Sequence, residues 1–541
     1  MKASTTTLPL TTGLIPYTGP WTFELAAHLL RRTTYGPTLT NIKWALGQGL
    51  EATVEKLFEE IPLPDPPVNA FYPGDPNVPI GETWIEEPYF NNILNEQASY
   101  RFRSVTSWTF GLMWQEGISI REKLTLFWHN HVPVNAVEDP KFLYRYGALL
   151  RSYAWGNFRD LMKDITIDPA MLRYLNGFQN QKEAPNENYA RELLELFTIG
   201  KGPLAAPGDY TNYNEQDVQA MARVLSGWTV FGLTIESTDG TFGAEFHPDR
   251  HDDGTKVLSD HFNNEVITDM GDQEYKHLID IIFQQEEVAR FICRKLYRWF
   301  VFYQINEVVE TDVIAPMAQI LLSNDFEIKP ALQALLKSEH FFDAAFAGVI
   351  IKNPVDFLMS IVKTFEVETS TGLDEIYDSW YRIWGFSRKM QMSYFEVPEV
   401  AGWQAYYREP LYYRNWLNAS TLPLRMDYSE GFCDAGFFPF QANGQVMRVE
   451  ALKLLDQLDS PDDPNAVVEE CVRLLFPKPI SQERKDALKA ILLPGLPDFE
   501  WTVEYQAYAA DPANPAVANP VEAKFRALVR SMVTMPDFFL S

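Results

Sequence analysis

The chain has 541 residues, 46% hydrophobic and 22% charged, a composition that excludes disordered, collagen-like and disulfide-scaffold proteins. Lys and Arg number 46 against 73 Asp and Glu, and the resulting net charge of −27 argues against a nucleic-acid-binding surface and against adsorption to anionic lipid. Three cysteines, Cys293, Cys433 and Cys471, are too few and too widely spaced for a disulfide framework or a CxxC metal knuckle.

Helical patterning runs along most of the chain. Apolar residues recur without strict alternation in 23–32, 41–60, 91–114, 141–164, 187–199, 214–226, 273–302, 313–338 and 448–474. Strand-like alternation is short and is clearest at 229–237, while 62–88 and 494–520 are rich in proline and predict extended excursions. We therefore expect a mostly α fold, a multi-helix packed globular architecture with long Pro-rich excursions and little β.

The expected organisation is a main helical domain over residues 1–350, with a C-terminal helical region, 351–541, packed on it as one continuous structural unit. No uncharged apolar run reaches 18 residues, so no transmembrane helix is expected. The first residues lack the continuous apolar segment of a signal peptide, which favours a cytoplasmic protein by sequence.

The first chemistry-bearing motif is REKLTLFWHNHVPVN, residues 121–135. The proline after it predicts that a helix ends near Asn130. If the chain leaves that helix extended, His129 and His131 point the same way and can share one metal ion. The alternative is that one ring caps the helix and the other is buried and hydrogen-bonded.

The second motif is APNENYARELLELFTIGKG, residues 184–202. Helical spacing places Glu187, Arg191, Glu192 and Glu195 in one contiguous arc. Such an arc can be a solvated face carrying ordinary i,i+4 ion pairs. It can also be the wall of a cleft, in which paired carboxylates ligate a metal or divide acid and base roles.

The third motif is FHPDRHDDGTKVL, residues 246–258. It holds His247 and His251 together with Asp252 and Asp253, and its Asp-Gly dipeptide predicts a turn. Histidines and aspartates in a loop suit a site better than a core, although the acid spacing of an EF-hand is missing. The motif therefore indicates metal binding.

Standard motifs of other enzyme classes are absent: the sequence has no HExxH, GxSxG or GxxxxGK[ST]. We therefore hypothesise a metal-assisted enzyme, of the hydrolase class, whose three motifs converge on one cleft around a divalent metal ion. Its ligands would be His129, His131, His247 and His251, with Asp252 or Asp253. Glu187, Glu192 or Glu195 would act as general base or ligand, and Arg191 would orient them.

The same stretches carry a family resemblance. They include AAHLLRRTTYGPT (26–38), REKLTLFWHNH (121–131), YNEQDVQAMARVLSGW (213–228) and IKNPVDFL (351–358), and they resemble the bacterial domain-of-unknown-function 1800 family. The resemblance implies a mostly helical protein without assigned catalytic residues, often exported and often encoded beside a sulfatase-like family. It therefore implies export and a sulfatase-like partner protein. The alternative function is a non-catalytic binding or assembly protein, in which the motifs form a buried polar network.

Overall fold

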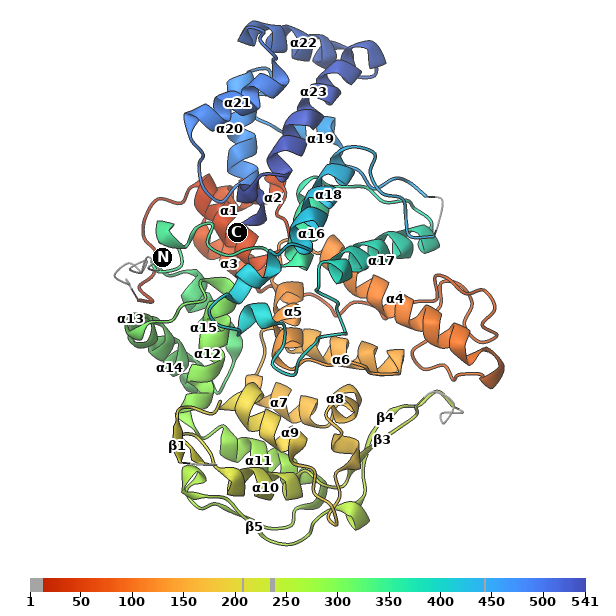
Figure 1. The fold of residues 1–541 in the computed structure, drawn as a ribbon, viewed down its shortest axis with the longest axis vertical. Helices are drawn as coiled ribbons and strands as arrows, with labels where there is room; N and C mark the ends of the chain where they lie inside the picture. The colour runs from red at the N-terminus through yellow and green to blue at the C-terminus, as the bar shows by residue number, and fades with distance from the viewer. Residues whose placement is uncertain (1–12, 207–208, 234–238, 442–443) are drawn as a thin grey trace.

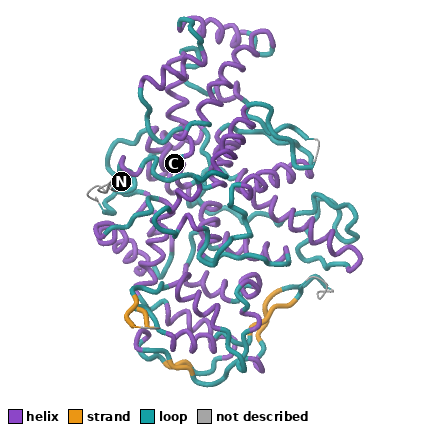
Figure 2. The backbone as a smooth tube through the Cα atoms, viewed as in Figure 1, coloured by secondary structure: helices purple, strands orange, loops and turns teal. Residues whose placement is uncertain are grey.

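The structure is a computed structural model that describes residues 13–206, 209–233, 239–441 and 444–541. It is mostly helical, which confirms the expected fold class (Figures 1 and 2). The middle of the molecule holds α1 (Phe23–Thr33), α2 (Leu39–Gln48), α3 (Leu50–Leu57), α4 (Leu94–Gln115), α5 (Arg121–His131), α6 (Pro140–Ser152), α16 (Pro354–Thr364), α17 (Leu373–Lys389) and α18 (Thr421–Cys433).

Three further groups of helices surround this middle (Figure 1). At the lower end lie α7 (Phe158–Thr166), α8 (Pro169–Tyr174), α9 (Glu187–Glu192), the π-helical turn η3 (Leu193–Thr198), α10 (Glu215–Val224) and α11 (Glu274–Ile282). On one side lie α12 (Glu286–Phe300), α13 (Glu307–Val309), the π-helical turn η8 (Glu310–Ile314), α14 (Ala315–Ser323) and α15 (Ile328–Leu336). At the upper end lie α19 (Ala451–Leu455), α20 (Pro464–Leu475), α21 (Gln482–Leu492), α22 (Asp498–Ala510) and α23 (Pro515–Val533).

Strands are few and short in the described residues (Figure 2). They form three antiparallel pairs: β1 (Leu204–Ala206) with β2 (Asp209–Tyr210), β3 (Trp228–Phe231) with β4 (Gly243–Phe246), and β5 (Lys256–Val257) with β6 (Val266–Ile267). The strand expected at 229–237 corresponds to β3, and residues 234–238 lie outside the described residues. Single 3-10 turns connect the elements: η1 (Asn91–Ile93), η2 (Gly177–Gln179), η5 (Pro248–Arg250), η6 (Asp260–Phe262), η7 (Gly271–Gln273), η9 (Ala344–Phe346), η10 (Gln404–Tyr406), η11 (Tyr412–Trp416) and η12 (Pro536–Phe539).

Several helices begin at an Asp-Pro or Asn-Pro dipeptide. The acidic or amide side chain accepts a backbone N–H of the first turn, and proline fills the first helical position, where no hydrogen-bond donor is needed. This device starts α6, α8, α16, α20 and α23, whose capping residues are Asp139, Asp168, Asn353, Asp463 and Asn514.

The structure bears out one of the two expected proline-rich excursions and contradicts the other. Residues 62–88 contain no helix and are held by an isolated bridge between Val68 and Thr83, so the first excursion is confirmed. The expectation for 494–520 was wrong, because α22 and the start of α23 occupy most of it. There Pro497 is the N-cap of α22 and Pro515 the first residue of α23, so these prolines start helices instead of excluding them.

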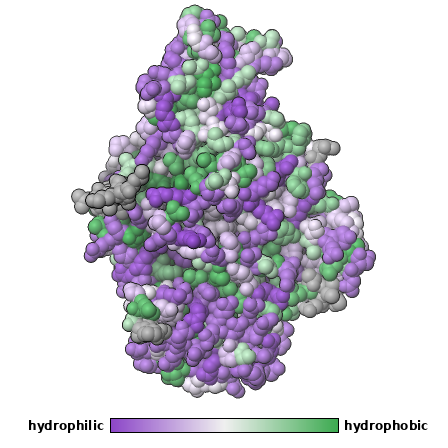
Figure 3. Space-filling view, in the orientation of Figure 1, coloured by the Kyte–Doolittle hydropathy of each residue, from purple (hydrophilic) through white to green (hydrophobic). Residues whose placement is uncertain are grey.

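Buried residues from both parts of the chain form one hydrophobic cluster, from Phe23 to Phe539. The helix α17 packs along α4, and α20 contacts α1, so helices after residue 350 cover helices before it. Figure 3 shows a mostly hydrophilic surface over the lower helices on the face drawn. Within the described ranges, no helix combines the length and apolarity needed to cross a bilayer.

Candidate functional site

The first motif does not place its two histidines together. The helix α5 continues through His131, so the two rings leave opposite sides of the helix. His129 is fully buried: its Nε2 accepts the Phe395 N–H (3.1 Å) and its Nδ1 lies 2.9 Å from the Tyr146 hydroxyl. Burial lowers the pKa of His129 to about 3, so the ring is neutral and both nitrogens already have protein partners.

His131 is also buried and fully engaged. Its Nε2 lies 2.9 Å from the carbonyl oxygen of Phe197, an acceptor only, so this nitrogen carries the hydrogen. Its Nδ1 then accepts from the Lys295 ammonium, at 3.0 Å. Burial, helped by Lys295, holds the pKa of His131 well below its ordinary range. The ring thus ties α5 to η3 and α12, and no ring nitrogen remains directed at a cavity.

The acidic helix is divided among several cations. Arg191 contacts Glu187 (3.0 Å) and makes a two-pronged contact with Glu215 (2.8 Å), and Glu195 pairs with Lys201 (2.5 Å). The expected Glu187–Arg191 pair is present, whereas Arg191 turns to α10 and not to Glu195. The reason is η3, whose wider turn breaks the 3.6-residue spacing after Glu192.

Glu192 differs from Glu187 and Glu195, which are held in ion pairs. Burial and the nearby charge of Glu195 raise the pKa of its carboxyl group. It therefore fits the acid–base role expected for it better than Glu187 does, which is held in an ion pair. That role stays a prediction.

The third motif splits between the surface and the interior. His247 is half-buried and lies 2.9 Å from Glu245, and Asp253 is exposed. Asp252 is held by a two-pronged contact with Arg223, which lowers the pKa of its carboxyl group. Of the predicted metal ligands in this motif, His251 turns inward, with 3% of its surface exposed.

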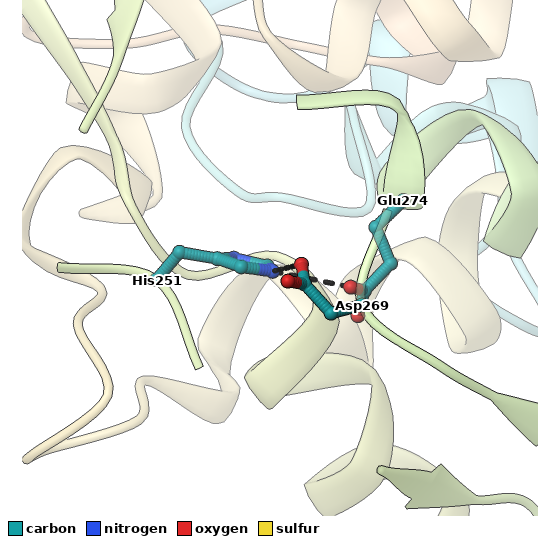
Figure 4. A group of neighbouring side chains, drawn as sticks. All are labelled: His251, Asp269 and Glu274. Atoms are coloured by element: carbon teal, nitrogen blue, oxygen red, sulfur yellow. Dashed lines mark hydrogen bonds and ion pairs between the residues drawn. The ribbon is translucent and has the colours of Figure 1, made fainter. Parts of the chain in front are cut away.

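His251 meets two carboxylates that the motif does not contain. Its Nε2 lies 3.1 Å from Glu274 Oε2 and 3.8 Å from Asp269 Oδ1 (Figure 4). Among the described residues, these three side chains form a group of His, Cys, Asp or Glu with at least three members whose ligand atoms all lie within 4.8 Å of one another. Glu274 is fully buried and Asp269 is exposed, so the cluster extends from the interior to solvent.

The backbone fixes which nitrogen of His251 faces the carboxylates. Its Nδ1 lies 2.9 Å from the carbonyl oxygen of Ser226, which can only accept, so Nδ1 carries a hydrogen. The Nε2 atom is left for the carboxylates. Burial alone would lower the pKa of His251, but its hydrogen bonds to Glu274 and Ser226 outweigh burial and raise it.

A lysine completes the cluster. Lys256 is fully buried on β5, and its ammonium lies 2.5 Å from Glu274 Oε1 and donates to the backbone carbonyl of Asp252. Glu274 is thus shared between Lys256 and His251. Sequence reasoning missed Asp269 and Glu274 because they lie 18 and 23 positions beyond His251, outside the loop motif; helix patterning at 273–302 gave no sign that its first turn faces that loop.

The three motifs lie in neighbouring elements without forming one cleft. The helix α10 packs against α9 and against β5, and η3 contacts α12. Their polar side chains nevertheless point to separate partners, and of the predicted metal ligands only His251 belongs to a cluster that could hold an ion.

Comparison with known proteins gives a family match. The family model described as a protein of unknown function (DUF1800) matches residues 28–540, whereas no curated protein and no solved structure matches the chain. Because the match covers nearly the whole sequence, the chain belongs to the DUF1800 family.

Proposed function

We propose that the protein binds a divalent metal ion between His251, Asp269 and Glu274 and uses it to activate water, as a metal-dependent hydrolase does. One observation carries the proposal. If His251 is neutral, the Nε2 lone pair faces two carboxylate oxygens, which is repulsive unless a cation lies between them. That cation is either a proton or a metal ion.

The spacing suits a metal ion. Ligands about 2.1 Å from a tetrahedral zinc ion lie roughly 3.4 Å from one another, and the two distances from His251 Nε2, 3.1 and 3.8 Å, lie on either side of that value. The hydrogen bond from Nδ1 to a backbone carbonyl is the usual outer support of a metal-binding histidine. Three protein ligands leave a fourth position for water, which solvent can reach past the exposed Asp269.

The test is the metal content of untagged protein, measured by elemental analysis after exposure to zinc or manganese and removal of the excess. We expect about one ion per chain, and loss of the ion in His251→Gln and Glu274→Gln. His247→Gln is the matched control, because it removes a histidine of the same loop that lies outside the cluster. Wild-type protein without metal, or equal loss in the control, would refute the proposal. Metal-dependent cleavage of nitrophenyl acetate or nitrophenyl phosphate would then support the hydrolase class.

The second candidate function is that of a binding or assembly protein, and Lys256 favours it. Its ammonium already balances Glu274, so a protonated His251, Glu274 and Lys256 would make a self-contained buried network that fixes the loop on α11. In that case His251→Gln lowers the thermal midpoint while wild-type protein holds no metal, and the same elemental analysis separates the two functions.

A further inference from the structure

A second polar region lies where α1, α5, α12 and α16 meet, well apart in sequence from the loop motif. It consists of two adjoining cavities that share Arg31 and Asp356 in their walls. Figure 1 shows α1, α16 and the C-terminal end of the chain together in the middle of the molecule.

Cations dominate the walls. The first cavity adds Lys352 to the shared pair, and the second adds Arg32, Lys123 and Arg298. Five cationic side chains thus line the two cavities together with one side-chain carboxylate and with Ser541, the last residue of the sequence, in a protein whose net charge is −27. Buried charges are normally paired, so this local excess of positive charge calls for a physical reason.

Existing contacts do not neutralise the excess. Asp356 pairs with Lys123 and also accepts a hydrogen bond from Asn353 (2.8 Å). Arg32 is 3% exposed, and within the described ranges it donates to three backbone carbonyls: those of Phe300 (3.1 Å), Val301 (3.0 Å) and Phe346 (2.6 Å).

Arg31 and Lys352 likewise contact uncharged groups. Arg31 donates to the carbonyls of Arg473 and Leu474, and the Lys352 ammonium lies 3.3 Å from the Ser360 hydroxyl and 4.1 Å from the centre of the Phe538 ring. Burial lowers the pKa of Arg31 and of Arg32 to about 10, and holds that of Lys352 well below its ordinary range. Such depression marks cations for which the loss of water outweighs the attraction of nearby carboxylates, Glu24 for Arg31 and Asp356 for Arg32 and Lys352.

Residues of the second cavity also carry hydrogen-bond donors without partners. Three residues lining the second cavity have a buried N–H group with no hydrogen-bond partner in the described part of the chain: Arg32 at Nε, and Trp299 and Trp416 at their indole nitrogens. All three groups donate, so an acceptor would satisfy each of them. Buried donors without partners are costly and are uncommon in folded proteins.

The wall is also aromatic. Trp299 stacks on Tyr406 with ring centres 4.4 Å apart, and Trp416 meets Tyr406 edge-on at 6.1 Å. A cavity that joins cations, N–H donors and stacked rings suits a ligand with an oxyanion at one end and a flat or apolar body at the other.

From these observations we propose that the paired cavities bind a phosphate-sized oxyanion, either free or as the monoester group of a small organic molecule. Arg31, Arg298 and Lys352 supply positive charge, the indole N–H groups supply neutral donors, and Asp356 opposes the ligand. This site is independent of the metal proposed at His251.

Calorimetric titration of the full chain tests the proposal with inorganic phosphate, sulfate and phenyl phosphate, each at matched ionic strength with chloride as the reference. We expect saturable binding of phosphate or sulfate. Tighter binding of phenyl phosphate identifies an ester ligand, because only that probe reaches the aromatic wall, whereas equal binding identifies the free ion.

Two variants give opposite predictions. Arg298→Gln should weaken phosphate binding by about tenfold or more, the size expected for loss of one charge-assisted hydrogen bond. Asp356→Asn should strengthen binding, because it removes the only opposing side-chain carboxylate, and a gain cannot arise from a folding defect. Arg388→Gln removes the same charge at an exposed site and should leave the affinity unchanged. No saturable binding of any probe, or no gain in Asp356→Asn, overturns the proposal.

Discussion

Two histidines of this protein, His129 and His251, differ in the groups that their ring nitrogens contact. For His129, the second nitrogen meets a backbone N–H, which leaves no lone pair for a cation. For His251, the second nitrogen meets two carboxylates, which require a cation between them. The same residue type, in two motifs that look equally suited to metal binding, therefore has a packing role in one place and a candidate ligand role in the other.

Replacing His129 should affect stability and not metal binding. His129→Ala removes two buried hydrogen bonds and a ring stacked 4.2 Å from that of Tyr394, so we expect the free energy of unfolding to fall by about 3 kcal/mol. Urea denaturation measures the loss, and His247→Ala, whose side chain is 39% exposed, should cost far less, about 0.5 kcal/mol. A stable His129→Ala protein that has lost bound metal would contradict this view.

Asp168 should make stability depend on pH. It is 2% exposed at the start of α8, its Oδ2 has no hydrogen-bond partner among the described residues, and burial raises its pKa from 3.8 to about 7. The folded state therefore holds the proton more tightly than the unfolded state, so this carboxyl group contributes stability at low pH that is lost as the pH rises from 3.8 to about 7.

The variant Asp168→Asn isolates that contribution, since asparagine still caps the helix but does not titrate. Measured by urea denaturation at several pH values, the variant should lose less stability than wild type between pH 4 and pH 7. Asp463→Asn, at the exposed start of α20, is the matched control and should keep the wild-type slope. Identical slopes for Asp168→Asn and wild type would show that Asp168 is ionised throughout.

At the scale of elements, the start of α10 organises the loop that carries His251. Asn214 and Asp217 form a reciprocal capping box, and Asp217 also accepts the N–H and the hydroxyl of Ser259, both at 2.7 Å. One fully buried carboxylate thus satisfies a helix end and anchors the chain just after β5. This anchoring holds Lys256 against Glu274.

Removing the anchor should loosen the candidate site. We expect Asp217→Ala to destabilise the protein by roughly 2–4 kcal/mol, because it leaves several buried donors without an acceptor. Amide hydrogen exchange should accelerate over β5 and β6, and any metal bound at His251 should be held more weakly. Gln219→Ala, at an exposed position two residues later on the same helix, serves as the control. Unchanged exchange in the β5–β6 loop would mean that other contacts hold it.

Local chemistry explains which elements could be predicted from sequence. Periodicity and Asp-Pro or Asn-Pro starts are properties of neighbouring residues, so the helices and the mostly α fold were predictable. The segment 494–520 was missed because proline at a helix start and proline in an extended strand look alike in composition. The partners of His251 could not be foreseen, since Asp269 and Glu274 reach it only through the packing of α11 and the loop, which no local pattern encodes.

At the scale of the whole molecule, the two halves of the chain complete each other's polar groups. His129 of α5 accepts from Phe395, Lys123 pairs with Asp356, and Arg103 of α4 pairs with Asp378 of α17. Residues 1–350 therefore carry a large face that residues 351–541 cover, with buried charges whose partners lie on the other side. Such a face is unlike the small polar contacts between separable domains.

It follows that residues 1–350 should not fold alone. Expressed without residues 351–541, this fragment would expose the α4 face and leave Lys123 and His129 without their partners, so we expect it to aggregate or to lack cooperative unfolding. Co-expression of the two fragments should restore a soluble complex, detected by size-exclusion chromatography. The full chain should unfold in one transition with coincident circular dichroism and tryptophan fluorescence curves. A monomeric 1–350 fragment with its own cooperative transition would instead identify two independent domains.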